Sequence, residues 1–378
     1  MNKILVWAKA AGRCTFCNTP VVEAAELGEP VPIGELAHNV GWSESSPRGE
    51  DPLSFQQRAD ASNLILACRN CHKPIDDGGV AGRYTVEELK RRKQEHESRI
   101  ESLTAIGADR SAYVLRIVGD VRGVPAELAR PTVLAATTAA GLYPRILPGS
   151  HWDSDADLDL RNRGDLNTMR DFERLASEIT DFTKRVHDGV RRDVVTRIAV
   201  FAFARIPLLV ALGARLDDKV HALVFQRHRT DAMNAWTWPS SQKQLTLFRV
   251  TRVRMGNSSQ SVTLLLNLSG TIHEQDLPAE TTSDHHIYTI SPVPPAEPGP
   301  TLVTSPADLA SFEGAMREFL ATVEADHGKL DAINVFAAVG ISSAVTIGRV
   351  LMPHVSPALD IYDRSDNGSF FLALRVRR

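Results

Sequence analysis

The chain has 378 residues, of which 43% are hydrophobic and 24% charged, and its formal net charge is −3. At roughly 100 to 200 residues per domain, this length predicts two or three globular domains. The near-neutral balance argues against a nucleic-acid-binding surface along the whole chain, and no run approaches the roughly 20 apolar residues that span a bilayer, so we expect a cytoplasmic protein whose contacts with nucleic acid are local.

All four cysteines lie near the N-terminus as two C-x-x-C pairs, Cys14/Cys17 and Cys68/Cys71. In a reducing compartment such pairs are more often zinc ligands than disulfides, because both thiolates of a pair can turn inward from one knuckle. Four thiolates leave no open coordination position. The pattern therefore predicts a structural Zn²⁺ ion that folds a small module and takes no part in chemistry.

Three further polar residues follow in the order His, Asn, His. His38 ends a short predicted strand, Asn63 opens a second strand that enters the next cysteine pair, and His72 stands at the start of a predicted helix or turn. Taken alone, a histidine on a strand is usually a packed or solvated residue. Within a four-cysteine cage, however, this order of residues is a nuclease signature.

Over about residues 1–100, this strand, strand, helix layout resembles the HNH endonucleases and their ββα-metal fold. The resemblance implies that His38 is the general base that activates water, that Asn63 orients the His38 imidazole through its backbone, and that His72 ligates a catalytic Mg²⁺ or a similar cation. A neutral imidazole can accept a proton near pH 7, and a divalent cation offsets charge on the leaving 3′ oxygen.

One position departs from the family pattern. Many members carry an acidic residue or a second histidine immediately before the base, whereas this chain has Ala37. Glu35 is expected on the same strand face as Ala37 and could supply the missing carboxylate ligand. Asp76 and Asp77 are the other candidates, and for each acid a solvated surface position is an equal alternative.

The charged run from Thr85 to Ile100 predicts a helix, with Thr85 as its N-cap and Glu88 completing a capping box. Its basic cluster, Lys90–Lys93, could contact DNA phosphates. A solvated linker helix with i,i+4 charge pairs is slightly favoured. We place the α+β zinc-stapled domain at residues 1–104 and a linker at 105–112.

Apolar strands alternate with helical stretches from Tyr113 onward, which predicts α/β architecture with parallel sheets covered on both faces. The strand, turn and apolar helix of residues 198–213 recur at 333–348. Another strand follows each copy, at 221–226 and 358–362. Residues 113–121 and 262–270 read as comparable strands upstream of the two copies.

The two copies have the same layout, with Phe201 matching Phe336 and Gly213 matching Gly348. Such an internal duplication is a fairly specific signal. It predicts two fused, pseudo-symmetric Rossmann-like halves, at about 113–245 and 246–378.

Ligands of such sheets bind beyond the carboxyl ends of the strands, where helix N-termini present N–H groups to anions. Equivalent turns occupy this place in the two halves: Arg205, Ile206 and Pro207 in the first, and Gly340, Ile341, Ser342 and Ser343 in the second. A pseudo-twofold pair of anion-binding turns suits a cyclic ligand with two or more phosphates.

Three residues between these turns complete the candidate ligand site. Gln226 and Arg229 lie in one polar stretch, and Arg229, like Arg205, could pair with a phosphate. Trp236 lies in a loop-like stretch and could stack on a ligand base. A surface position for each arginine and simple packing for the tryptophan are the alternatives.

Residues 110–378 resemble the SAVED domain, a fusion of two CARF-like subunits that senses cyclic oligonucleotides. The segments that carry this resemblance are the strand and turn from Phe201 to Pro207, the helix ending in Gly213, the polar stretch 226–229, and Trp236-Thr237-Trp238. Joined to an HNH module, this region resembles the HNH-SAVED effectors of CBASS antiphage defence. The resemblance implies an endonuclease that degrades double-stranded DNA when a cyclic di- or trinucleotide binds, and that forms a homo-oligomer on activation.

Two other functions remain open. A modification-dependent restriction enzyme would use the C-terminal region to read DNA, although a duplicated and nearly neutral region speaks against that function. A zinc-dependent DNA-binding sensor without catalysis would not need the His, Asn, His set. The Pro-rich stretch 291–300 is expected to be an exposed internal linker that leads into a helix from Ser305, with a partner-binding motif as the less favoured alternative.

Overall fold

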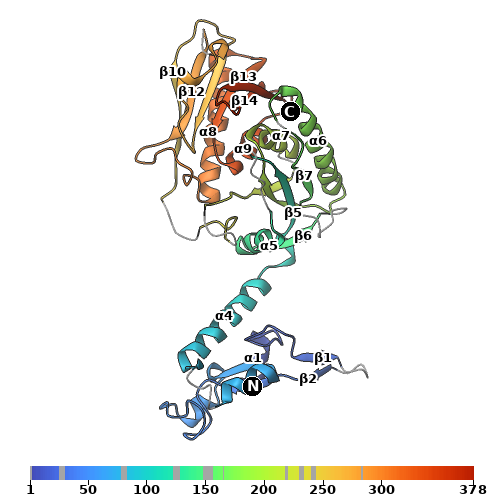
Figure 1. Cartoon of the computed structure of the whole chain (residues 1–378), viewed down its shortest axis with the longest axis vertical. Helices are drawn as coiled ribbons and strands as arrows, with labels where there is room; N and C mark the ends of the chain where they lie inside the picture. Colours follow the sequence, from blue (N-terminus) through green and yellow to red (C-terminus); the bar gives the residue numbers. More distant parts are fainter. Residues whose placement is uncertain are drawn as a thin grey trace. The chain divides into compact units, whose positions relative to one another are not determined.

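The computed structural model describes residues 2–24, 30–77, 83–121, 128–147, 156–164, 166–217, 220–229, 234–239, 244–281 and 284–378. The chain separates into two compact units, Met1–Gly107 and Ala108–Arg378 (Figure 1). This division falls inside the stretch 105–112, where the sequence predicts a linker. None of the helices in the described ranges is long and apolar enough to cross a membrane.

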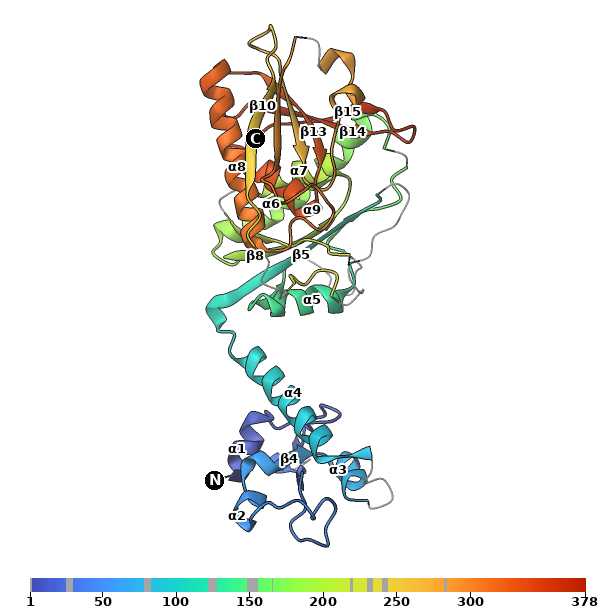
Figure 2. The same cartoon turned by 90° about the vertical axis from the view of Figure 1, so that its left-hand side faces the viewer.

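The first unit is built around a small antiparallel strand pair, β3 and β4, with helices on both sides (Figure 2). Its elements are α1 (Asn2–Lys9), β1 (Val22–Ala24), β2 (Pro30–Pro32), β3 (Glu35–His38), α2 (Phe55–Arg58), η1 (Ala61–Asn63), β4 (Leu64–Ala67), α3 (Arg69–Asp76) and α4 (Val86–Thr104). The sequence predicts the strand, strand, helix order, and β3, β4 and α3 confirm it.

Strand β4 is apolar throughout because both of its faces are covered. Leu64 and Leu66 pack with Val6 and Ala10 of the α1 region, whereas Ile65 points the other way. Ile65 packs with Ala37, Ile75 and Leu89, which come from β3, α3 and α4. Alternation along the strand therefore fixes α1 against one face and α3 and α4 against the other.

Two predicted boundaries in this unit are displaced. Asn63 ends a 3₁₀ turn, in which the Asp60 side chain accepts from the Ser62 N–H, so it precedes the strand instead of opening it. Helix α3 begins at Arg69, three residues before His72, because Cys68 already has the extended backbone of an N-cap. His72 consequently lies inside the helix.

Helix α4 begins as predicted, with the Thr85 hydroxyl accepting from the Glu88 N–H at 3.2 Å. The predicted capping box was wrong in its second half, because the Glu88 carboxylate binds Arg91 and Arg92 instead. Arg91 also pairs with Glu95, and similar i,i+4 pairing joins Lys93 to Glu97. These partners agree with a charge-paired helix face, on which Lys93 and Glu97 are largely covered.

The second unit contains two sheets. The first sheet is parallel throughout, in the order β6-β5-β8-β9 with β7 also paired to β5. Its strands and helices are β5 (Ser111–Gly119), α5 (Arg130–Ala139), β6 (Tyr143–Ile146), β7 (Leu158–Leu160), α6 (Met169–Arg191), β8 (Arg197–Phe203), α7 (Ile206–Leu216) and β9 (His221–Val224).

The second sheet has six strands in the order β10-β12-β11-β13-β14-β15. Its elements are β10 (Phe248–Arg254), β11 (Val262–Asn267), β12 (His286–Pro292), α8 (Pro306–His327), β13 (Ala332–Ala338), α9 (Ile341–Arg349), β14 (Ala358–Arg364) and β15 (Phe370–Val376). The four central strands are parallel, as predicted. The prediction of a purely parallel sheet was wrong at the two edges, where β10 and β15 run antiparallel to their neighbours.

The predicted duplication appears as two strand–helix–strand units, β8-α7-β9 and β13-α9-β14. Helices α7 and α9 lie side by side (Figures 1 and 2). They cross at Gly213 and Gly348, the two glycines that match in the sequence repeat. A Cβ atom on Gly213 would lie 1.9 Å from the Val345 carbonyl oxygen, and one on Gly348 would lie 1.9 Å from that of Val210. These reciprocal contacts relate the halves by a pseudo-twofold axis, and one hydrophobic core runs through both.

The Pro-rich stretch is not a linker along its whole length. Ser291 and Pro292 are the last residues of β12, and Pro292 pairs with Phe248 of β10. Helix α8 then begins at Pro306, with the Ser305 hydroxyl accepting from the Asp308 N–H at 3.1 Å, as predicted.

Candidate functional site

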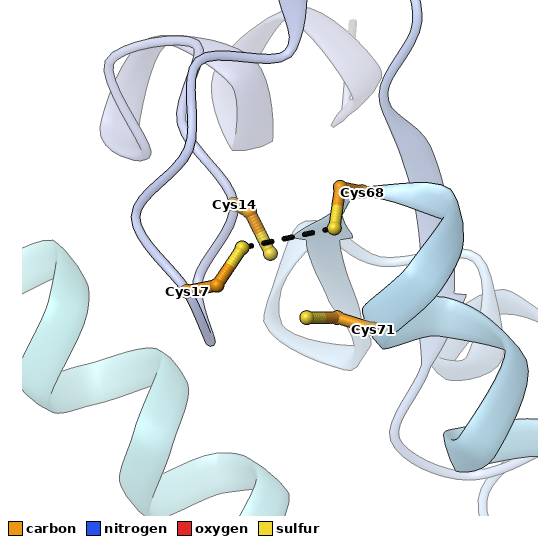
Figure 3. Close-up of side chains that lie close together, drawn as sticks. All are labelled: Cys14, Cys17, Cys68 and Cys71. Carbon is orange, nitrogen blue, oxygen red and sulfur yellow. Dashed lines mark hydrogen bonds between the residues drawn. The ribbon is translucent and has the colours of Figure 1, made fainter.

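The four cysteine side chains point toward one another from two knuckles (Figure 3). Cys14 and Cys17 lie in the turn after α1, while Cys68 caps α3 and Cys71 lies in its first turn. All four sulfur atoms lie within 4.8 Å of one another, and the Cys17 and Cys68 sulfurs are 3.7 Å apart. Four thiolates at the roughly 2.3 Å Zn–S distance of a tetrahedral site would have about this spacing, so the cluster can bind a metal such as zinc.

Burial raises the pKa of the Cys14 and Cys71 thiols, whereas a neighbouring hydroxyl favours the thiolate of Cys17. Its sulfur is hydrogen-bonded to the Thr19 hydroxyl at 3.3 Å, and this contact lowers the pKa of the thiol to about 6. The thiolate is the form that ligates metals.

Asn63 fixes the backbone that immediately follows His38. Its side-chain oxygen accepts from the Val40 N–H at 2.9 Å, and its side-chain nitrogen donates to the carbonyls of Val40 (2.9 Å) and Arg58 (3.0 Å). The Asn63 carbonyl accepts from the Asn39 N–H at 2.8 Å. Asn63 is only 2% exposed, and these hydrogen bonds all join it to backbone groups.

Arg48 supports the same segment from another side. Its guanidinium donates to the carbonyls of His38 (3.1 Å), Asn39 (2.6 Å) and Ile75 (2.9 Å). It thereby ties the end of β3 to α3. The sequence analysis did not single out this arginine, because nothing in its spacing distinguishes it from a surface residue of a polar loop.

His72 lies between two carboxylates. Its Nδ1 atom is 2.5 Å from Glu35 Oε2, and its Nε2 atom is 3.0 Å from Asp76 Oδ2. Two of the acids that the sequence proposed as cation ligands therefore contact the same imidazole on opposite nitrogens.

His38 is half-buried near this group. Burial lowers the pKa of its imidazole below 6.5; the negative charge of Asp76 acts in the opposite direction, and His72 lowers it further. His38 is therefore neutral near pH 7 and can accept a proton. His38 is thus within range of the charges of His72 and Asp76, and Asn63 holds the backbone that follows it.

In the second unit, Gln226 joins the two halves. It follows β9, and its side-chain oxygen accepts from the N–H (3.1 Å) and the hydroxyl (2.8 Å) of Ser342 in the first turn of α9. Gly340 makes room for it, because a Cβ atom there would lie 2.9 Å from the Gln226 amide. The adjacent Ser343 hydroxyl is buried without a hydrogen-bond partner among the described residues.

Arg205 is engaged differently from the prediction. Its three guanidinium nitrogens donate to Asp363 Oδ2 (2.9 Å) and to the carbonyls of Leu166 (2.7 Å) and Arg364 (2.8 Å). The arginine therefore links the start of α7 to the end of β14, and its contact with a phosphate stays a prediction. Ile206 and Pro207 begin α7, and Pro207 is buried and has no N–H to offer.

The expected stacking role of Trp236 was wrong for this structure. Its indole is 2% exposed and packs edge-on against Phe201, with ring centroids 5.5 Å apart. Phe201 stacks in turn on Phe225 at 4.3 Å. Simple packing, the stated alternative, is what the structure shows. Arg229 is exposed, while Ile341 packs against the core at the start of α9.

Residues 178–376 match the model of the SAVED family, described as a "SMODS-associated and fused to various effectors sensor domain". The chain belongs to the SAVED family. The match begins within α6 and covers both strand–helix–strand repeats, so the predicted SAVED/CARF-like α/β fold of the C-terminal part is confirmed. No curated protein is significantly similar to the chain in sequence.

Solved structures similar to this SAVED protein include two Cap4 SAVED/CARF-domain containing receptors. The receptor of Acinetobacter baumannii, solved with the cyclic trinucleotide 3′3′3′-cAAA, is 12% identical over 78% of this chain and 62% of its own, with a TM-score of 0.46. The receptor of Moraxella osloensis is 14% identical over 60% of this chain and 49% of its own, with a TM-score of 0.38. The present chain thus covers less than two thirds of the length of either receptor.

Proposed function

We propose that this protein is a metal-dependent HNH endonuclease of CBASS antiphage defence, in which a cyclic oligonucleotide bound by the SAVED domain activates cleavage of double-stranded DNA. The observation that carries the proposal is the grouping of His38, Asn63 and His72 on a strand–strand–helix unit beside a four-cysteine cluster. A sensor family whose members are fused to various effectors supports the pairing of the two units.

His38 is the general base of the proposed reaction. Its lowered pKa keeps the imidazole neutral, so that it can take a proton from water attacking the scissile phosphate. Asn63 and Arg48 hold the backbone on which it stands, which keeps the imidazole in one position. Preorganisation of this kind lowers the cost of reaching the reactive geometry.

The contacts of His72 suggest which residues would hold the catalytic cation. If Nδ1–H donates to Glu35, the lone pair of Nε2 faces the Asp76 carboxylate, and these two groups together offer one nitrogen and one oxygen ligand. A Mg²⁺ ion bound there would offset charge on the leaving 3′ oxygen. Glu35 then orients His72 from behind, as carboxylates commonly do for ligating histidines.

The SAVED ligand is proposed to bind where Gln226 meets the N-terminus of α9. The N–H groups at the start of a helix favour anions, and the buried Ser343 hydroxyl offers an unused hydrogen-bonding group. Gln226 comes from the first half and α9 from the second. A cyclic oligonucleotide bound there would contact both halves of the SAVED domain. Its binding could therefore favour one arrangement of the two halves over another.

The decisive experiment is plasmid cleavage by the purified full chain in Mg²⁺ against a panel of cyclic di- and trinucleotides. Wild type, His38→Ala and the exposed control His273→Ala are compared. Cleavage with one or two ligands that disappears only in His38→Ala supports the gated nuclease. Cleavage that needs no ligand would favour the restriction-type enzyme, and no cleavage by the wild type under any condition would contradict the nuclease assignment.

A further inference from the structure

Two large aromatic side chains are exposed beside the proposed base. Trp42 and Phe55 are 44% and 65% exposed. Their rings meet edge to face with centroids 4.3 Å apart, and Trp42 in turn contacts the His38 imidazole at 5.8 Å. The result is a continuous row of rings that begins at His38 and ends in solvent.

The segments that present these rings are fixed from the protein side. Arg58 is 7% exposed, and its guanidinium donates to the carbonyls of Leu53 (3.0 Å), Gly49 (2.8 Å) and Asp51 (2.7 Å), and to that of Gly41. One buried arginine thus satisfies four carbonyls of the loop between β3 and α2. The loop is therefore held in one shape without covering the two rings.

Phe55 is fixed further by a complete capping box at the start of α2. The Ser54 hydroxyl accepts from the Gln57 N–H at 3.4 Å, and the Gln57 side chain accepts from the Ser54 N–H at 2.8 Å. Exposed aromatic groups on a rigid scaffold lose little conformational entropy when they bind a planar partner. A contiguous exposed apolar patch commonly marks an interaction or ligand-binding site.

We propose that Trp42 and Phe55 form a stacking platform for a nucleobase next to the phosphate that is attacked by the water His38 activates. The proposal rests on the nuclease function proposed above, and it names the form of DNA that the site prefers. A nucleobase fits because it is planar and is joined to the phosphate that must lie at His38. The direct ring contact between Trp42 and His38 places the platform within one nucleotide of the reacting group.

A base can stack on this platform only after it leaves the duplex stack. Unstacking costs a few kcal/mol in a perfect duplex and least for a mismatched or unpaired base. DNA with a bulged or single-stranded nucleotide at the cleavage position is therefore the preferred substrate, and perfect duplex is cut more slowly. This preference depends on structure and not on the identity of the base, because every base has a face to stack.

The test uses the full-length chain with the His38→Ala substitution, so that DNA is bound without being cut and a displaced His38 cannot affect the result. Binding is measured in the presence of the cyclic nucleotide that supports plasmid cleavage by the wild type. The probes are a short duplex with one bulged nucleotide, the same duplex with the bulged base removed to leave an abasic site, and the fully paired duplex. Trp42→Ala, Phe55→Ala, the conservative Trp42→Phe and the exposed control Ile4→Ala are compared.

Trp42→Ala and Phe55→Ala should each weaken binding of the bulged duplex by roughly 5- to 150-fold, the range that stacking of one base on one aromatic side chain gives. They should change binding of the abasic duplex little, since its base is already missing. Trp42→Phe should retain most of the affinity, and Ile4→Ala, which removes a 75% exposed side chain of α1, should retain all of it.

Several results would overturn the proposal in distinguishable ways. Equal losses on the bulged and abasic duplexes would show that the rings support the site or contact the backbone. No loss on any DNA, with reduced self-association of Trp42→Ala, would assign the rings to contact with a second copy of the chain. In both cases cleavage by the wild type would leave the nuclease function intact, whereas a wild type that neither binds nor cuts DNA would end both proposals.

Discussion

Asn63 holds the loop that follows the proposed base with three side-chain hydrogen bonds to the backbone. Asn63→Ala should leave the Val40 N–H and the carbonyls of Val40 and Arg58 buried without these partners. Leaving a buried group unpaired costs about 1 to 3 kcal/mol. We expect the Val40 amide to lose protection in hydrogen exchange and DNA cleavage to fall with it.

The matched control for this experiment is Asn70→Ala, which removes an exposed asparagine from α3. It should leave both protection and cleavage unchanged. If the Val40 amide of Asn63→Ala stayed protected while cleavage was lost, Asn63 would act directly on DNA or the cation, and its assignment as a backbone anchor would be wrong.

The order of residues in the sequence selected the candidates for the catalytic site. It gave no sign of the residues whose side chains bind backbone carbonyl groups. His38, Asn63 and His72 could be selected because few patterns place them inside a four-cysteine cage. Arg48 and Arg58 bind carbonyl groups that are close only in the folded loop, and no local pattern records such contacts. Trp236 shows the opposite error, since a tryptophan in a polar stretch gave no sign that its indole packs on Phe201.

The two cysteine knuckles link α1 to α3, so metal removal should affect the first unit selectively. The two small apolar clusters around β4 offer limited burial, and modules of this size commonly depend on their metal for folding. Chelation, or Cys71→Ser, should unfold residues 2–104 and leave the second unit folded. Hydrogen exchange resolved by peptide, together with metal analysis of the purified chain, measures both effects.

The control for the metal experiment is addition of Zn²⁺ after chelation, which should restore protection in the first unit of the wild type but not of Cys71→Ser. Protection that survives in a chain shown to be free of metal would mean that the apolar clusters suffice and that the cysteines have another role.

The crossing of α7 and α9 depends on two glycines. A Cβ atom on Gly213 or Gly348 would lie 1.9 Å from a carbonyl oxygen of the other helix, so the helices must separate. Overpacking of this kind costs typically about 1 to 3 kcal/mol. Gly213→Ala and Gly348→Ala should each lower the free energy of unfolding of the second unit by about this amount, as measured by urea denaturation.

Gly314→Ala is the matched control, because Gly314 lies inside α8 and a Cβ atom there would meet nothing within 4 Å. This change should stabilise the unit by roughly 0.5 to 1 kcal/mol, since alanine is the better helix former. If all three substitutions changed the free energy of unfolding equally, the crossing of α7 and α9 would tolerate a Cβ atom. The close approach of the two helices would then not be needed for stability.

The central elements of both sheets were predictable because a buried parallel strand and the helix after it leave a strong repeated pattern. The edge strands were not, because β10 and β15 pair antiparallel and need no crossover helix. Strand β15 follows β14 through a short turn closed by the Ser365 N–H and the Ser369 carbonyl at 2.9 Å. Its direction is set by that turn and not by the repeat.

The duplication also bears on how the whole protein would be switched. A ligand can favour one state only through a difference in affinity between two states, and moving a pair of states from 1:99 to 99:1 takes about 5.5 kcal/mol of such difference. Gln226 and Ser342 supply contacts from both halves at one place. The resemblance to the HNH-SAVED effectors implies that the active state is an assembly of several chains, in which the proposed nuclease units are brought together.

This assembly has two measurable consequences. With saturating cyclic nucleotide, sedimentation should show a larger species, and the cleavage rate should rise more steeply than in proportion to the concentration of the chain. His38→Ala should form the same species without cutting, because the histidine lies outside the SAVED domain. When mixed in excess with wild type at saturating ligand, it should lower cleavage by entering mixed assemblies. A ligand-saturated sample with the mass and shape of the free protein would show that activation occurs within a single chain.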